Sequence, residues 1–189
     1  DAPKHRGLTY FALDMHAPGV DVRPLRQITG EAEFNEVYLT GVRVPDADRI
    51  GGLGDGWRVS LTTLMNERVT IGGAVAGRDS GPIGDALEVW REHPESHDPV
   101  RRDRLARLWI DAEVLRLTNA RAAANRQAGA AGPEGSVAKL AFAETNRSIY
   151  ELCMDVLGAD GLLYPSYEMV RPEEASLTGG GDPRKMFLR

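Results

Sequence analysis

The alternation of apolar and polar side chains at the start of the chain is typical of β-strands. Strands are expected over residues 8–14, which are mostly aromatic and apolar, and over residues 20–28, where Pro24 indicates an edge strand or a bulge. Residues 34–39 alternate most clearly, and residues 41–45 are expected to form a short last strand. The beginning of the chain is therefore predicted to be β structure.

The sequence IGGLGDGW at residues 50–57 marks a change of architecture, because four of its residues are glycine. From Trp57 onwards apolar residues recur at helical spacing: Val59, Leu61, Leu64, Met65, Val69 and Ile71. This spacing predicts a largely buried helix that continues towards Trp90, with Asp55 as its N-cap.

Two further long helices are predicted. Asp98 followed by Pro99 is a typical helix start, and the apolar residues after it recur at helical spacing on one face. After a loop rich in glycine and alanine, Ser136 is expected to begin the next helix and Gly158 to end it. The tail is loop-rich with short helical segments. The predicted fold class is therefore mainly α with a β segment, in which strands precede an antiparallel helical bundle.

The composition is that of an ordinary globular protein, with 42% hydrophobic and 27% charged residues among 189. A formal net charge of -5 and a pI near 5.4 argue against nucleic acid as the main partner. No apolar run approaches the roughly 20 residues that span a bilayer, and no secretory signal opens the chain, so a cytoplasmic location is expected. The chain lacks an initiator methionine and stops without a terminating signal, which favours a piece of a longer protein.

The cysteine and histidine residues of this sequence predict neither a disulfide bond nor a metal site. Cys153 is the one cysteine, which excludes a disulfide within the chain, and its apolar helical surroundings predict a buried structural thiol. His93 and His97 have the i, i+4 spacing of a helical metal site, but Pro94 breaks the helix that this spacing requires. No metal site is therefore predicted.

The adjacent pair Glu67 and Arg68 is the one charged pair inside an apolar helical run, TTLMNERVTIGG. Consecutive helical residues point about 100° apart, so both side chains cannot share one polar face. Either the pair is a structural ion pair, or at least one member enters an apolar interior. A carboxylate in a water-poor site binds protons more tightly and suits a general base, which makes Glu67 a candidate.

Two stretches resemble the acyl-CoA dehydrogenase family. Residues 7–73 contain the pattern PGVDVRP, then FNEVYL, then GDGW and ERVTIGG, which is similar to the family's passage from its middle β domain into its C-terminal helices. Residues 138–164, which include DVLGADG, resemble a later bundle helix and the glycine turn after it. The resemblance implies a partial middle β domain over residues 1–52 and the C-terminal four-helix bundle domain over residues 53–189.

Members of this family use FAD to oxidise an acyl-CoA thioester to the 2,3-enoyl-CoA. The resemblance therefore implies an oxidoreductase of fatty acid or lipid catabolism that assembles as a homo- or heterotetramer and passes electrons to an electron-transfer flavoprotein. This chain by itself is expected to be inactive.

The family places its catalytic glutamate either near its C-terminus or on the first bundle helix directly before an arginine. The second arrangement matches Glu67 as the base and Arg68 beside the substrate thioester. A base beyond Arg189 is the other possibility. The glycines of LGADG, Gly158 and Gly161, correspond to a turn near the adenosine half of a neighbouring subunit's FAD.

One departure from the family pattern leaves alternatives open. The family's R..FG motif, whose arginine reaches the FAD pyrophosphate, is expected near residues 91–100, which read REHPESHDPV. FAD phosphates are then held differently, or the chain is a flavin-poor structural subunit of a heteromeric dehydrogenase. An acyl-CoA oxidase-like relative is a further alternative with the same fold. A wide exposed apolar surface is also expected, because other domains and subunits cover these elements in the family.

Overall fold

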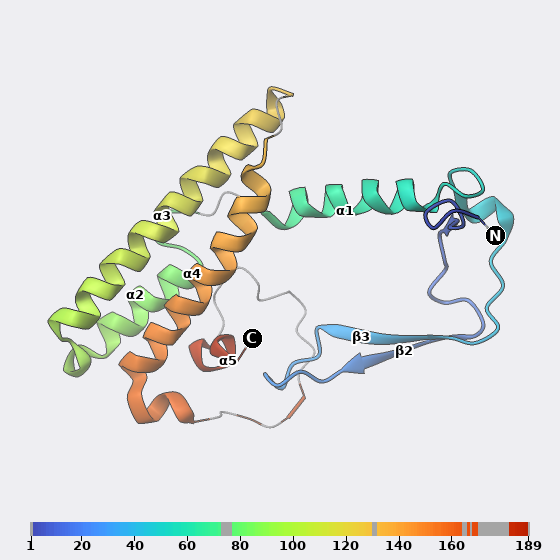
Figure 1. Cartoon of the computed structure of the whole chain (residues 1–189). Helices are drawn as coiled ribbons and strands as arrows, with labels where there is room; N and C mark the ends of the chain where they lie inside the picture. Colours follow the sequence, from blue (N-terminus) through green and yellow to red (C-terminus); the bar gives the residue numbers. More distant parts are fainter. Residues whose placement is uncertain are drawn as a thin grey trace. The chain divides into compact units, whose positions relative to one another are not determined.

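The computed structural model describes residues 2–72, 77–129, 132–163, 166, 168–169 and 182–188, with the side chains of residues 68–72 left out. By its internal contacts the chain divides into two compact units (Figure 1). The first unit consists of Asp1–Leu25 and Phe34–Ile71, and the second of Arg26–Glu33 and Gly72–Arg189.

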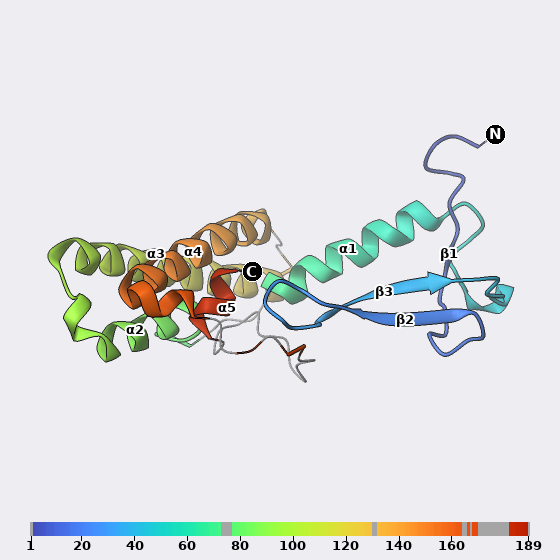
Figure 2. The same ribbon diagram turned by 90° about the horizontal axis from the view of Figure 1, so that it is seen from below.

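The first unit contains two small antiparallel sheets and one helix. Strand β2 (Val20–Leu25) pairs with β3 (Phe34–Leu39), and the short strands β1 (Tyr10–Phe11) and β4 (Arg49–Ile50) pair with each other (Figure 2). Helix α1 covers Gly56–Gly72. Since β2 and β3 form a two-stranded sheet, both are edge strands, which confirms the interpretation of Pro24.

The predicted strand over residues 41–45 is wrong. Gly41 has a φ of +63°, and Pro45 leads into a 3-10 turn over Asp46–Asp48, so pairing resumes at β4. The predicted strand over residues 8–14 shortens to β1 because β4 offers a partner of two residues. Strand β3 has the predicted bounds, whereas β2 ends three residues before position 28.

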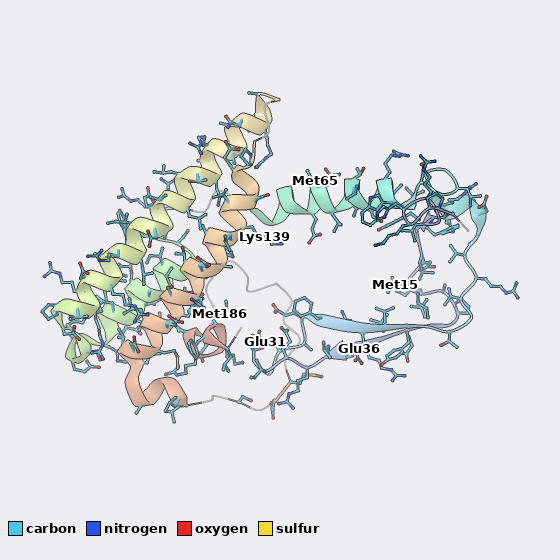
Figure 3. The ribbon with its side chains drawn as sticks, viewed as in Figure 1. Met15, Glu31, Glu36, Met65, Lys139 and Met186 are labelled. Carbon is cyan, nitrogen blue, oxygen red and sulfur yellow. The ribbon has the colours of Figure 1, made fainter. Side chains whose placement is uncertain are left out.

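The prediction of a largely buried helix from Trp57 to Trp90 is also wrong. Helix α1 ends at Gly72, and a separate helix begins at Pro82 after Gly81, which has a φ of +71°. Four large apolar side chains of α1 are exposed: Trp57 by 42%, Leu61 by 46%, Leu64 by 52% and Met65 by 59%. Met65 is labelled in Figure 3. Apolar periodicity identifies a face that can be covered, but it does not say which part of a protein covers it.

The second unit is helical. It contains α2 (Pro82–Glu92), α3 (Pro99–Gln127), α4 (Glu134–Leu157) and the short α5 (Pro183–Phe187), with 3-10 turns at Pro94–Ser96 and Gly158–Leu162. Helices α3 and α4 run antiparallel, side by side (Figures 1 and 2). The class predicted from the sequence, mainly α with a small antiparallel β segment, is confirmed.

The predicted helix ends are largely confirmed. The Asp98 carboxylate accepts hydrogen bonds of 2.8 Å from the backbone N–H groups of Val100 and Arg101, and Pro99 occupies the first helical position. Helix α4 begins at Glu134, two residues before the expected Ser136.

The core of the second unit lies where α2, α3 and α4 meet. Its buried residues are Ile83, Ala86, Val89, Leu105, Leu108, Ile149, Tyr150, Leu152, Cys153 and Val156, and Met186 of α5 packs against them (Figure 3). Burial raises the pKa of Tyr150, so its hydroxyl keeps its proton and donates to Asp85 across 3.1 Å. Each large apolar side chain buried here contributes roughly 1.5–3 kcal/mol.

Large apolar side chains also lie on the surface of the second unit. They include Ile110, Val114 and Leu117 of α3 and Val137 and Leu140 of α4, each more than half exposed. The predicted exposed apolar surface is thus confirmed. No helix in the described part of the chain combines the length and apolar character that crossing a bilayer requires.

The buried cysteine provides a test of this core. Cys153 is 1% exposed, as the sequence predicted, and burial raises the pKa of its thiol to about 12. Labelling by a thiol reagent at pH 8 is expected to be at least about 100-fold slower in the folded chain than in urea, because the thiolate is both scarce and covered. Comparable labelling rates in the two states would show that α4 does not pack in this way.

Candidate functional site

Glu67 lies in the last part of α1 and is exposed. It follows Leu64 by three residues, so it borders the exposed apolar stripe that Trp57, Leu61 and Leu64 form along one face of the helix. The expectation that at least one member of the charged pair enters an apolar interior stays a prediction, since only Glu67 is described and it is exposed within this chain. The side chain of Arg68 lies outside the described part of the chain.

Two threonine hydroxyls that precede Glu67 in α1 are bonded to the helix backbone. Thr63 donates to the backbone oxygen of Val59, and Thr62 donates to that of Arg58, each across 3.1 Å. In its described part, α1 therefore offers the Glu67 carboxylate beside apolar surface, with the Thr62 and Thr63 hydroxyls turned to the backbone.

Gly158 and Gly161 lie together in the turn after α4, residues 157–161, which we call the glycine turn. Gly158 has a φ of +56° and a ψ of -128°, a conformation that side chains disfavour, and a Cβ there would meet nothing within 4 Å. Gly161 is buried, and a Cβ there would lie 2.9 Å from Met154 Cε. Gly158 is thus needed for backbone conformation and leaves its backbone accessible, whereas Gly161 is needed for close packing.

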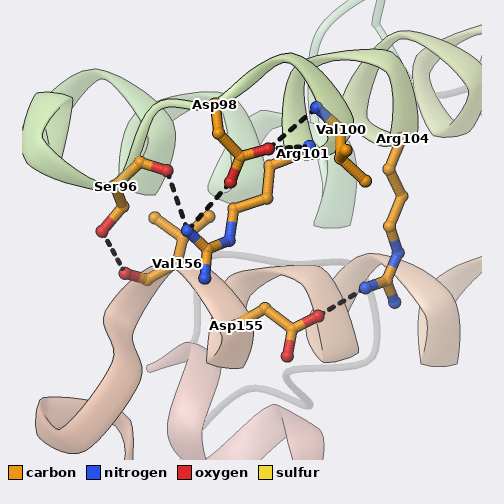
Figure 4. Close-up of polar contacts among 7 residues, drawn as sticks. All are labelled: Ser96, Asp98, Val100, Arg101, Arg104, Asp155 and Val156. Atoms are coloured by element: carbon orange, nitrogen blue, oxygen red, sulfur yellow. Dashed lines mark hydrogen bonds and ion pairs between the residues drawn. The ribbon is translucent and has the colours of Figure 1, made fainter.

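Side chains distant in sequence contact the end of α4 next to this turn (Figure 4). Ser96 Oγ donates to the backbone oxygen of Val156 across 2.8 Å. The Arg104 guanidinium donates to Asp155 and lies 3.5 Å from Glu151 Oε2. These contacts join residues about fifty to sixty positions apart, so no local sequence pattern could have identified Ser96 and Arg104.

Residues 91–100 connect α2 to α3 through the 3-10 turn at Pro94–Ser96. The His97 ring stacks on Trp90 with the ring centroids 3.8 Å apart, and its Nε2 lies 2.7 Å from the Trp90 backbone oxygen. His93 Nδ1 instead lies 3.0 Å from Glu95 Oε1. The two histidines therefore have separate partners, and within the described residues no group of three or more His, Cys, Asp and Glu side chains could hold a metal ion.

The sequence-predicted residues fall in both units. Glu67 and Arg68 are consecutive residues of α1, in the first unit, whereas Gly158 and Gly161 share one turn of the second. The described residues thus provide a carboxylate at the border of an apolar helix face in the first unit and a turn with exposed backbone in the second.

Comparison with known proteins decides the family. The profile of the family described as "Acyl-CoA dehydrogenase, C-terminal domain" matches residues 54–176. The chain belongs to the acyl-CoA dehydrogenase family. Acyl-CoA dehydrogenase FadE34 of Mycobacterium tuberculosis is 38% identical over 183 residues, which cover 95% of this chain and 25% of that protein. The resemblance seen in the sequence motifs is therefore confirmed.

Solved acyl-CoA dehydrogenase structures have the same fold. The chain matches the Tcur3481-Tcur3483 steroid ACAD with a TM-score of 0.75 and 24% identity, covering 100% of this chain and 47% of that one. It matches the ChsE4-ChsE5 complex from Mycobacterium tuberculosis with a TM-score of 0.70 and 26% identity, covering 98% of this chain and 47% of that one. The chain thus spans about half of these acyl-CoA dehydrogenase chains and a quarter of FadE34.

Two glycines of α4 and its turn give a paired test of the backbone. Gly158→Ala is expected to lower the free energy of unfolding by roughly 1–3 kcal/mol, the usual cost of a side chain in a sparsely populated conformation. Gly135, near the start of α4, lacks a positive φ and has empty space around its Cβ position, so Gly135→Ala is expected to raise stability by up to about 1 kcal/mol. Urea unfolding measures both changes, and two changes of the same sign would contradict the geometry of the turn.

Proposed function

We propose that the full-length protein is an FAD-dependent acyl-CoA dehydrogenase that converts an acyl-CoA thioester to the 2,3-enoyl-CoA, with Glu67 as the base. One observation carries the proposal. Glu67 directly precedes Arg68 on α1, beside the exposed apolar stripe of Trp57, Leu61 and Leu64, in a chain of the acyl-CoA dehydrogenase family.

In this reaction the substrate loses a proton from its α-carbon and a hydride from its β-carbon, and a double bond forms between the two carbons. Glu67 takes the proton, and Arg68 lies near the thioester. FAD supplies the acceptor for the hydride. An acyl chain and further protein surface that cover the apolar stripe remove water from around Glu67, and a desolvated carboxylate is a stronger base.

The glycine turn fits a contact with the adenosine half of FAD. The backbone at Gly158 is accessible, because Gly158 is exposed and a Cβ there would meet no atom beyond its own neighbours in the chain. The neighbouring arginines are paired with carboxylates: Arg101 with Asp98, Arg104 with Asp155, and Arg184 with Asp182. Among the described residues the turn therefore offers backbone contacts and no unpaired arginine, and the FAD phosphates take their cations from elsewhere.

The proposed partners follow from the family. The reduced flavin passes its electrons to an electron-transfer flavoprotein, the enzyme is a homo- or heterotetramer in the cytoplasm, and the pathway is the breakdown of fatty acids or other lipids. Two of the matched structures, the ChsE4-ChsE5 complex and the Tcur3481-Tcur3483 steroid ACAD, are named for pairs of proteins, which favours a heteromer.

A second candidate function is a flavin-poor structural subunit of a heteromeric dehydrogenase. The segment over residues 91–100 favours it, because in place of the motif that reaches the FAD pyrophosphate it contains the 3-10 turn and His97, which stacks on Trp90. The Glu67–Arg68 pair opposes it, because an assembly subunit has no need of a base beside the substrate.

The substitution Glu67→Gln tests the proposed base, because it keeps the shape of the side chain and removes the ability to take a proton. In the full-length protein it is expected to retain FAD and acyl-CoA binding while slowing flavin reduction by at least roughly 10²-fold, the lower end for loss of a general base. Rapid mixing of the oxidised protein with an acyl-CoA, followed by flavin absorbance, measures the rate.

The exposed Glu88 of α2 provides the matched control. Glu88→Gln removes the same charge from a different helix than the one that carries Glu67 and Arg68. It is expected to leave the rate of flavin reduction unchanged. Near-normal flavin bleaching in Glu67→Gln would contradict the proposal and place the base in the other family position, beyond Arg189.

A further inference from the structure

The carboxyl end of α4 presents backbone oxygens at the glycine turn that need donors from outside the regular helix. The last four carbonyl groups of an α-helix lack partners within the helix and need donors from elsewhere. Gly158 N–H satisfies the oxygen of Met154, and Ser96 Oγ donates to the oxygen of Val156 across 2.8 Å. Ser96 belongs to the 3-10 turn at Pro94–Ser96, so the connection between α2 and α3 reaches the end of α4.

The Ser96 segment is itself held in place by α3 (Figure 4). Arg101 Nη1 donates to the backbone oxygen of Ser96 and to Asp98 Oδ2, each across 3.1 Å. The Asp98 carboxylate is fixed in turn by two backbone N–H groups, and these bonds lower its pKa. Local hydrogen bonds from Arg101 and Asp98 therefore hold the segment from which Ser96 donates to Val156.

Arg104 provides a second support from α3. Asp155 lies in the last turn of α4, where the helix dipole disfavours a negative charge, and no basic residue of α4 itself lies in that turn. The Arg104 guanidinium contacts both Asp155 and Glu151 and offsets that charge.

Arg184 of α5 provides a third support, on the turn itself. Its Nε donates to the backbone oxygen of Asp160 across 2.9 Å, and its Nη1 lies 3.4 Å from Asp182 Oδ1. Contacts from three separate elements, the 3-10 turn, α3 and α5, thus converge on residues 155–160.

We infer that Ser96, Arg104 and Arg184 are positioning residues for the cofactor, because they fix the glycine turn in the conformation that contacts FAD. The inference rests on the proposed function, in which Gly158 and Gly161 lie against the adenosine half of FAD. It gives residues 91–100 a role in this chain: the segment supports the turn through Ser96 instead of reaching the cofactor with an arginine.

Variants at position 96 test the inference in the full-length protein. Thr and Val have nearly the same shape, so Ser96→Thr keeps the hydroxyl donor and Ser96→Val removes it. After removal of bound flavin, Ser96→Val is expected to bind FAD about tenfold more weakly than the wild type, the size of one lost hydrogen bond, and Ser96→Thr is expected to restore the affinity. Flavin fluorescence measures the dissociation constant at a temperature where each variant is folded.

A second pair of variants keeps the test valid if position 96 tolerates no change. Arg104→Met is expected to weaken FAD binding by a similar factor. Arg107 is the matched control, because it is an exposed arginine of the same helix whose ion pair with Asp103 stays within α3. Arg107→Met is expected to leave the FAD dissociation constant unchanged.

Hydrogen–deuterium exchange of the backbone amides in residues 158–161 distinguishes the positioning role of Ser96 and Arg104 from the proposed contact between the turn and FAD. In the wild type, FAD is expected to slow this exchange, and in Ser96→Val without FAD the exchange is expected to be faster. Faster exchange with unchanged FAD affinity in both Ser96→Val and Arg104→Met would overturn the positioning role and leave the proposed cofactor contact intact. If FAD does not slow the exchange of these amides in the wild type, the proposed contact between the glycine turn and FAD is wrong.

Discussion

The burial of one face of α4 is the constraint on which the second unit depends. Ile149, Leu152, Cys153 and Val156 recur every three or four residues and pack against α2 and α3. This packing continues to Val156, and Gly158 with its φ of +56° then ends the helix at the glycine turn. The same face of α4 that holds the core together therefore determines where the accessible backbone of Gly158 is presented.

Helix α1 has a similar apolar pattern with a different outcome. Trp57, Leu61 and Leu64 recur at helical spacing, yet each is more than two-fifths exposed within this chain. An apolar face that stays uncovered marks a surface for a ligand or for further protein. Glu67 borders that face, which gives a carboxylate an environment that becomes dry when the surface is covered, and this is the environment that a proton-abstracting base requires.

Local chemistry made several features predictable from the sequence. Asp98 followed by Pro99 began a helix as expected, Gly158 ended one, and Cys153 was buried. The strand expected over residues 41–45 and the long helix expected from Trp57 to Trp90 failed, because a glycine with positive φ and a loop before Pro82 redirect the chain. The supports of the glycine turn were unpredictable, since the contact of Ser96 with Val156 joins residues that only the tertiary packing brings together.

The flavin content of the purified full-length protein tests the central claim most directly. We expect a yellow protein with oxidised-flavin absorbance that anaerobic addition of an acyl-CoA bleaches, because the chain belongs to the acyl-CoA dehydrogenase family and carries Glu67 beside Arg68. A colourless protein that binds no added FAD, alone or with a partner subunit, would contradict a catalytic role and establish the structural subunit instead.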